Sequence, residues 1–163
     1  GMGRPFQPFP LSCLYSASLN DAMTSKAALT GDRSMGRVVL VGILLRGDRV
    51  LLVKRAASRA LAPGLWDFPG GHSEDGEMPE QTLVRELAEE LGVVPTEYRN
   101  LPNPSLNADG LLAHTYYVTQ WTGTPGNLQE HEHSELAWVR LTEVDKLELA
   151  TPIMLTQLQA IQK

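Results

Sequence analysis

Three glutamates near the middle of the chain have the chemistry and spacing of a metal site. Glu86, Glu89 and Glu90 stand at positions i, i+3 and i+4 of segment 71–93, which carries seven acidic residues and Arg85 as its one strongly basic residue. At about 100° per residue, an α-helix would place the three carboxylates on one arc of roughly 100°. Carboxylates on one rigid face suit a hard divalent cation such as Mg²⁺ or Mn²⁺.

Helix signals flank these glutamates. Pro79 suits a first helical position, because its missing N–H would have no partner there, and Gly92 suits the residue just past the end. Between them, Leu83, Leu87 and Leu91 recur at every fourth position and form an apolar stripe. The sequence therefore predicts a helix from Pro79 to Leu91 that buries this stripe and presents the glutamates beside it.

A solvated acidic face is the plain alternative for a helix so rich in glutamate. Two features favour a site instead. Glu89 and Glu90 adjoin the apolar stripe, and Arg85 is placed to pair with Glu77 in the preceding loop. That pairing would fix the loop leading from Gly70-Gly71, where a glycine pair lets the backbone approach a ligand closely.

The segment resembles the box of the Nudix family, and of its MutT-like members in particular. The match runs through Gly71, five residues, Glu77, seven residues, and then RELAEELGV over 85–93. The resemblance implies a hydrolase that cleaves a nucleoside diphosphate linked to a further group X, a (d)NTP or a related nucleotide, with Mg²⁺ or Mn²⁺ as cofactor. Metal ions would neutralise the pyrophosphate and lower the pKa of a bound water.

The resemblance also implies roles for individual residues. Arg85 would orient the box by pairing with Glu77, and Glu86 is a candidate base for the attacking water. The implied metal ligands are Glu86, Glu89, Glu90 and the carbonyl of Gly71.

MutT-like members often add one carboxylate from the loop before the last strand. Here a polar loop spans 123–134 and the predicted last strand spans 136–141. Glu130, Glu132 and Glu135 are all within range of the site. The spacing selects none of them, and we favour Glu130. The histidines of this loop, at 131 and 133, are weak candidates for zinc because no thiolates accompany them.

The β-branched run 37–46, the turn at Gly47-Asp48 and the run 49–55 predict a β-hairpin. Lys54 and Arg55 end it and would point toward the site if it resembles the family hairpin. Either could contact a phosphate, and Arg55 is preferred because its guanidinium fits phosphate oxygens. The alternative is a solvated strand end.

Aromatic residues are candidates for stacking on a nucleobase. Trp66 and Phe68 alternate in the strand before the box, and Tyr116 and Tyr117 lie in the strong strand 111–121. For all of them, core packing is the competing interpretation.

The residue before the final helix bears on which nucleobase the enzyme recognises. MutT-like enzymes that read oxidised guanine often place an asparagine just before the final helix, which we predict over 152–162. This chain has Thr151 there. The departure weakens the expectation of 8-oxo-dGTP as the substrate.

The chain of 163 residues carries a net charge of −5. It shows no basic stripe for a nucleic acid polymer and no apolar run of about 18 residues that would cross a membrane. Cys13 is its only cysteine, which fits a reducing, cytoplasmic location. We expect a small-molecule nucleotide as the partner and consider a homodimer.

We predict an α/β chain, and the family resemblance implies a Nudix fold, in which a mixed curved β-sheet is sandwiched between helices. Residues 1–34 read as an N-terminal extension, with Gly1 as an expression scar, and residues 35–163 as the Nudix hydrolase domain. A catalytically silent nucleotide-binding sensor is the alternative function. A protein-interaction domain with a plain acidic helix is a third interpretation, and it would bind no metal.

Overall fold

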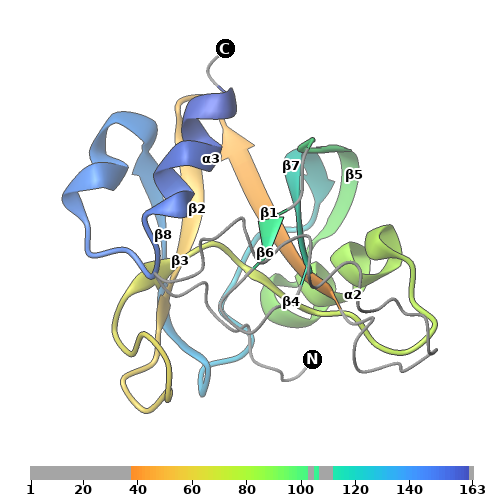
Figure 1. The fold of residues 1–163 in the computed structure, drawn as a ribbon, viewed down its shortest axis with the longest axis horizontal. Coiled ribbons are helices and arrows are strands. Elements are labelled where there is room, and N and C mark those ends of the chain that lie inside the picture. Colours follow the sequence, from red (N-terminus) through yellow and green to blue (C-terminus); the bar gives the residue numbers. More distant parts are fainter. Residues whose placement is uncertain (1–37, 103–104, 107–111, 162–163) are drawn as a thin grey trace.

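A curved mixed sheet with helices on both faces forms the domain (Figure 1). The computed structural model describes residues 38–102, 105–106 and 112–161. The main strand order is β3-β2-β1-β7-β5, while β4 pairs with β1, β6 with β7 and β8 with β2. The elements are β1 (Val38–Arg46), β2 (Arg49–Arg55), β3 (Trp66–Asp67), β4 (Gly70–His72), α2 (Pro79–Leu91), β5 (Val94–Asn100), β6 (Ser105–Leu106), β7 (Leu112–Thr122), β8 (His133–Arg140), the 3-10 helix η2 (Leu141–Lys146) and α3 (Ile153–Ile161).

This arrangement confirms the predicted α/β architecture of a mixed curved sheet between helices. The extension predicted over residues 1–34 lies outside the described residues, so it stays a prediction. None of the described helices is long and apolar enough to cross a membrane. The cytoplasmic location also stays a prediction.

Strand β1 lies at the centre because both of its faces are apolar. Val39, Val41 and Ile43 enter the core cluster on one face, and Leu40 and Leu44 enter the cluster on the other. Such a run is typical of a strand buried on both sides. β1 pairs in parallel with β7 along its length and antiparallel with β4 at one end and β2 at the other. The sheet therefore forks along β1, and the fork leaves room for β4 beside it.

Helix α2 covers one face of the sheet and has the predicted bounds. Its stripe of Leu83, Leu87 and Leu91 is buried against the β1 side chains of that face. Burial of each such leucine stabilises the fold by about 1.5–3 kcal/mol. Gly92 ends the helix at φ 76° and donates its N–H to carbonyls of the last turn, the left-handed cap predicted for it.

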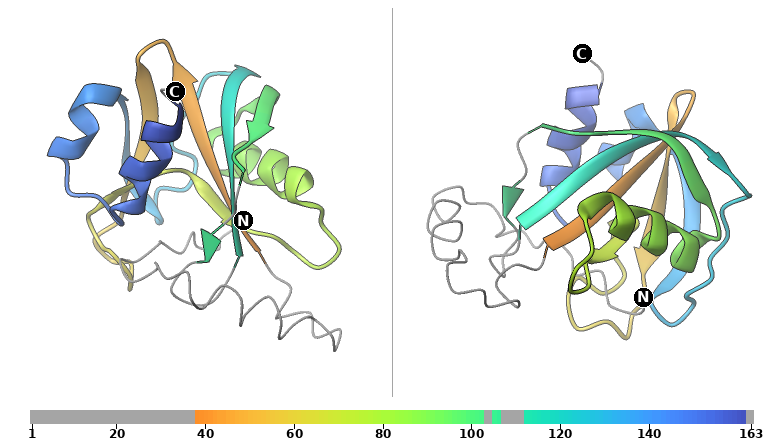
Figure 2. Two further views of the ribbon diagram at one scale, coloured as in Figure 1. Left: turned by 45° about the horizontal axis from the view of Figure 1, so that its top comes forward. Right: turned by 90° about the vertical axis from the view of Figure 1, so that its right-hand side faces the viewer.

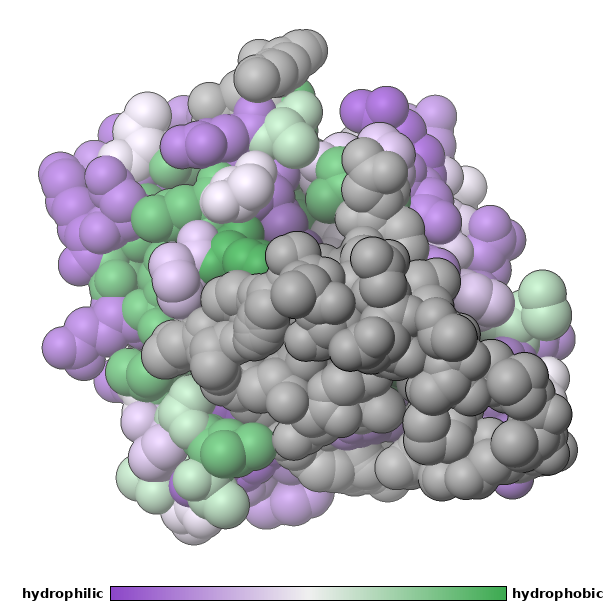
Figure 3. Space-filling model, viewed as in Figure 1, coloured by the Kyte–Doolittle hydropathy of each residue, from purple (hydrophilic) through white to green (hydrophobic). Residues whose placement is uncertain are grey.

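Helix α3 covers the opposite face, so the two helices lie on either side of the sheet (Figure 2). Met154 and Leu158 of α3 and Val144 of η2 are buried against β1 and β2. The space-filling view from this side shows hydrophobic side chains gathered around α3 and hydrophilic ones toward the margins (Figure 3). α3 begins one residue later than predicted, at Ile153.

The last strand differs most from the prediction. β8 begins at His133, three residues before the predicted start at Leu136. Its pairing with β2 sets His133 opposite Arg55, with an irregular register between Lys54 and Arg55. The short helix after it is a 3-10 helix that starts at Leu141. The earlier start brings part of a predicted loop to the edge of the acidic helix.

Candidate active site

Arg85 ties the loop before α2 to the helix itself. Its Nε donates to Glu77 Oε2 at 2.6 Å and its Nη2 donates to Glu77 Oε1 at 2.9 Å. The same Nη2 donates to the carbonyl of His72 at 2.9 Å, and Thr82 Oγ1 donates to Glu77 at 2.8 Å. The pairing predicted from the sequence is therefore present. It fixes the end of β4 against the first turns of α2.

The carboxylates of the helix divide into a buried pair and a half-exposed member. Glu86 and Glu90 are only 1% and 2% exposed, while Glu89 lies nearer solvent. Gly70 N–H donates to Glu90 Oε1 at 3.3 Å. A methyl group on Gly71 would occupy the space of the Glu86 carboxylate. The glycine pair of β4 thus lets the backbone lie directly against the two buried acids.

The electrostatics of these acids are unfavourable without a cation. Burial raises the pKa of Glu86, and Arg85 only partly opposes this. Burial, followed by repulsion from Glu86 and Glu132, raises the pKa of Glu90 well above its usual range. By contrast, the hydrogen bond from Arg85 lowers the pKa of Glu77 to about 2. Carboxylates gathered in this way favour a bound divalent cation, which would neutralise them.

Glu132, and not Glu130, is the added carboxylate at the cluster. Glu130 is exposed in the turn before β8, whereas Glu132 is 5% exposed and lies beside Glu90. The Glu132 carbonyl accepts the N–H of Ala56 at 2.9 Å, which holds this turn against the end of β2. The expectation for Glu130 is corrected because tertiary pairing with β2, rather than distance along the chain, decides which side chain turns inward.

His133 is a second residue that the sequence did not assign to the site. Its ring is fully buried, and one ring nitrogen lies within 4.8 Å of carboxylate oxygens of both Glu90 and Glu132. Burial, then the nearby Arg59 and Arg55, lower the pKa of His133 to about 3, so the ring is neutral at pH 7. Residues 133–135 are polar and the register with β2 is irregular there, so no alternation in the sequence would have placed His133 in the strand.

The sequence profile of the NUDIX domain matches residues 36–160. The chain belongs to the Nudix family. It is similar to the CTP pyrophosphohydrolase of Escherichia coli K12, with 37% identity over 69% of this chain and 82% of that protein. It is also similar to the nucleoside triphosphatase NudI of Enterobacter sp. 638, with 30% identity over 74% of this chain and 95% of that protein.

Solved structures agree with this membership. The MutT NUDIX hydrolase from Burkholderia pseudomallei is 31% identical with a TM-score of 0.59, over 65% of this chain and 84% of that one. This Nudix chain is therefore an enzyme that hydrolyses phosphorus-containing anhydrides, with nucleotide pyrophosphohydrolase activity. Nudix hydrolases depend on divalent metal, and the buried acids of this chain supply oxygen ligands for it.

The cations around the Nudix site are arranged differently from the prediction. Arg55 is fully buried, its Nη1 lies 3.6 Å from Asp67 Oδ2, and its Nε donates to the Leu61 carbonyl at 2.9 Å. Burial lowers the pKa of Arg55 to about 10 and raises that of Asp67 to about 7, each opposed by the partner's charge. In this structure the Arg55 side chain therefore lies buried at the end of β2, with no part of it exposed to solvent.

Two other cations lie nearer solvent. Arg59, which the sequence analysis did not single out, is half-buried and donates to the carbonyl of Glu132 at 3.3 Å. Lys54 has a half-exposed side chain, 4.0 Å from Glu135 and 5.8 Å from the Trp66 ring centroid. Arg59 therefore has part of its side chain in solvent next to Glu132, whereas the contacts of Lys54 are with Glu135 and Trp66, outside the acidic cluster, and Arg55 is fully buried.

The predicted base-stacking aromatics divide in the same way. Phe68 is fully buried in the core beneath α3, and Tyr116 is 3% exposed in the core beneath α2, where it meets Tyr98 edge to face. Core packing is therefore the role that the structure gives to both. Trp66 stays half-exposed at the sheet edge, where its carbonyl accepts the N–H of Ala150 at 2.8 Å.

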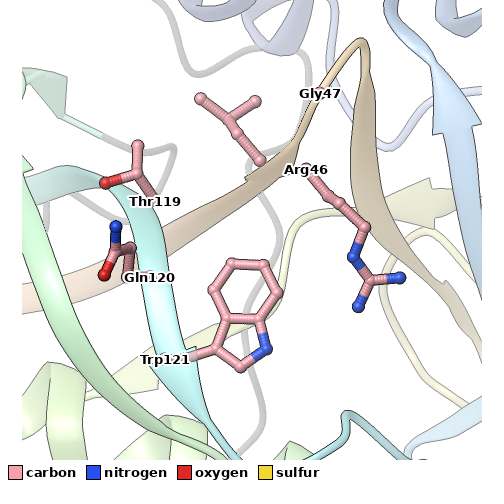
Figure 4. Close-up of a pocket in the computed structure, with 6 residues that line it drawn as sticks. Arg46, Gly47, Thr119, Gln120 and Trp121 are labelled. Atoms are coloured by element: carbon pink, nitrogen blue, oxygen red, sulfur yellow. The ribbon is translucent and has the colours of Figure 1, made fainter.

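A surface hollow at the hairpin end of β1 is separate from the Nudix site. Figure 4 shows Arg46, Gly47, Thr119, Gln120 and Trp121 around it. It forms where β1 turns into the hairpin and β7 continues past it. β2 runs from this hairpin to its other end, where the acidic cluster lies.

Proposed function

We propose that this Nudix enzyme hydrolyses nucleoside or deoxynucleoside triphosphates to the monophosphate and pyrophosphate, using Mg²⁺ or Mn²⁺. The observation that carries the proposal is the convergence of buried acids from α2 and from the turn before β8 beside the Gly70-Gly71 backbone. The names of the two relatives, a CTP pyrophosphohydrolase and a nucleoside triphosphatase, support the substrate class.

The metal would be held by carboxylates and would neutralise the phosphates and lower the pKa of a bound water. The proposed ligands are Glu86, Glu89, Glu90, Glu132 and the carbonyl of Gly71.

We assign Glu86 as the base in this reaction. Burial raises the pKa of Glu86, the direction that makes a carboxylate a better proton acceptor. The oxygen of a water molecule bonds to one phosphorus while the P–O bond of the anhydride breaks. One water proton passes to the Glu86 carboxylate. The leaving group, which is pyrophosphate or the nucleoside monophosphate according to the phosphorus attacked, takes the bonding electron pair. Arg85 and Glu77 position the base and do not touch the reacting atoms.

Arg59 and Lys54 are the proposed phosphate contacts from the protein. Arg59 has part of its side chain in solvent next to Glu132, and Lys54 has a half-exposed side chain near Glu135, outside the acidic cluster. A guanidinium can bind two phosphate oxygens at once, so Arg59 should contribute more than Lys54. Trp66 is the remaining candidate for contact with the nucleobase of the substrate.

Specificity for the base is proposed from Thr151. Thr151 is fully buried, and its Oγ1 accepts the N–H of Ile153 at 3.3 Å, so it caps α3. A threonine occupied in this way has no side-chain amide with which to read an oxidised purine. We therefore expect ordinary triphosphates to be hydrolysed at least as well as 8-oxo-dGTP.

The test is chromatographic analysis of the nucleotide products formed from a panel of (d)NTPs, 8-oxo-dGTP, ADP-ribose and nucleotide sugars, with Mg²⁺, with Mn²⁺ and with EDTA. Turnover of a triphosphate that EDTA abolishes is the expected result. If only ADP-ribose or a nucleotide sugar is hydrolysed, triphosphates are not the substrates and the proposed substrate class is wrong. Nucleotide binding without turnover of any compound would favour the sensor.

A further inference from the structure

A nitrogen ligand lies beside the carboxylates at one end of the acidic cluster. Glu90, Glu132 and His133 each offer one ligand atom, and these atoms lie within 4.8 Å of one another. All three residues are at least nine-tenths buried. Ligand atoms about 2.0–2.2 Å from a first-row metal ion lie roughly 3–4 Å apart. A small movement of the three side chains would therefore bring their ligand atoms to the spacing of a metal coordination sphere.

The ring nitrogens of His133 make no hydrogen bond to another described residue. Both nitrogens are buried. A buried polar group left in this state costs about 1–3 kcal/mol. A histidine used only for packing would normally donate one N–H to a carbonyl or carboxylate. Metal ligation through one nitrogen would give the ring a partner.

The backbone around the three residues is held in place. His133 N–H donates to the Gln129 carbonyl at 3.0 Å, and Asn127 Nδ2 donates to the His133 carbonyl at 2.7 Å. Glu132 lies in the turn before β8 and His133 begins the strand, so strand alternation does not force these adjacent side chains to opposite sides, and both have a ligand atom near Glu90.

The local charge also favours a cation. Nearby Arg55 pairs with Asp67, and Arg59 donates to the Glu132 backbone carbonyl. The carboxylates of Glu86, Glu90 and Glu132 repel one another, and a bound cation would relieve that repulsion.

We propose that Glu90, Glu132 and His133 hold one divalent ion in a mixed oxygen and nitrogen site, which favours Mn²⁺ or Co²⁺ over Mg²⁺. Mg²⁺ takes oxygen ligands almost exclusively, whereas imidazole suits transition metals. The ion's part in hydrolysis rests on the proposed function, but its binding does not.

The test is pulsed electron paramagnetic resonance of the full chain loaded with less than one equivalent of Mn²⁺. We expect electron spin echo modulation from a directly coordinated ¹⁴N. Labelling the four histidines of the chain with ¹⁵N should convert it to ¹⁵N modulation. Wild-type protein that binds Mn²⁺ without nitrogen coupling would overturn the inference, and no variant is needed to reach that result.

Variants then assign the nitrogen. His133→Gln should lose the coupling and weaken Mn²⁺ binding by at least about tenfold, since even partners outside the metal's own ligands are worth about 10–100-fold. Mg²⁺ binding should change far less. His131→Gln is the matched control, because His131 is exposed and its ring lies beside the same Glu132 carboxylate.

Circular dichroism checks that His133→Gln is folded. If it is not, Glu132→Gln keeps His133 and should retain the nitrogen coupling with weaker Mn²⁺ binding. Coupling that survives His133→Gln, or is lost in His131→Gln, would contradict the assignment. Hydrolysis with Mg²⁺ is measured separately, so a failure of the mixed site leaves the proposed function standing, and nitrogen coupling without turnover leaves the site standing.

Discussion

At the scale of single residues, Glu90 occupies the most crowded point of the acidic cluster. It is 2% exposed, accepts the Gly70 N–H, and has Glu86 and Glu132 as neighbouring acids. Burial and this repulsion raise the pKa of Glu90 well above its usual range, and a bound cation would favour the charged carboxylate. Glu90 therefore couples the ionisation of the site to metal binding.

Replacing Glu90 with glutamine keeps the shape and removes one ligand charge. We expect Glu90→Gln to lose about 10²-fold or more in kcat, the scale seen when a preorganised electrostatic group is removed. Glu80→Gln, on the same helix but exposed, is the control and should keep full activity. Kinetics with Mg²⁺ and calorimetric metal titration measure both. A Glu90→Gln enzyme with normal metal affinity would exclude Glu90 as a ligand.

Glu77 contributes stability through its ion pair with Arg85, and that contribution depends on pH. The pKa falls from 4.5 in the unfolded chain to about 2 in the folded one. The contribution is therefore fully present above pH 4.5 and is lost as the pH falls toward 2. We expect Glu77→Gln to be less stable than wild type at pH 7, with a gap that narrows through this range. Urea unfolding in EDTA at several pH values measures the gap, and a gap that does not depend on pH would contradict the assignment.

At the scale of elements, the site depends on how closely β4 approaches α2. β4 takes its place in the fork of the sheet beside β1, and the absence of a side chain at Gly71 leaves room for the Glu86 carboxylate. The close approach places backbone groups and carboxylates at one point. Two elements adjacent in sequence thereby build most of the site.

Gly71→Ala should disturb the site more than the fold. The added methyl would collide with the end of the Glu86 side chain, which can move aside at modest cost. We expect a folded protein with activity lowered by about 10²-fold, since a displacement of about 1 Å can cost that much. Gly126→Ala, where a methyl meets nothing within 4 Å, should be active. Normal kcat in Gly71→Ala would show that Glu86 need not lie against β4.

At the scale of the whole molecule, metal binding should stabilise the fold because its ligands come from distant parts of the chain. Glu90 lies on α2, whereas Glu132 and His133 lie at the start of β8. A cation that joins them links the covering helix of one face to the edge of the sheet. It binds the folded state and has no equivalent site in the unfolded chain.

The melting temperature should therefore rise with metal. At about 100 times Kd a ligand adds about 2.7 kcal/mol, and a domain of this size gains roughly 2–4 °C per kcal/mol, so we expect a rise of about 5–10 °C. EDTA should abolish the rise, and Glu90→Gln should reduce it. Differential scanning calorimetry is the measurement. An equal rise in Glu90→Gln would mean that the ion binds elsewhere.

Features whose residues lie close together in the sequence could be predicted without the structure. Cap residues and a four-residue leucine repeat set the bounds of α2, and the Arg85 and Glu77 pair lies within its reach, so the box could be read without a structure. The apolar run of β1 likewise identified a buried strand, because burial on both faces needs an unbroken series of such side chains.

Which residues from distant parts of the sequence lie beside the acids of α2 depends on strand pairing and was seen only in the folded structure. β2 and β8 pair across about eighty positions of sequence. This pairing and the Ala56 hydrogen bond hold the turn before β8 against the end of β2, where Glu132 and His133 are buried while Glu130 stays exposed. The fold also buries Arg55 against Asp67 and places Phe68 and Tyr116 in the two core clusters. Period-2 alternation states that a side chain faces one side of a sheet, but strand pairing decides what lies on that side.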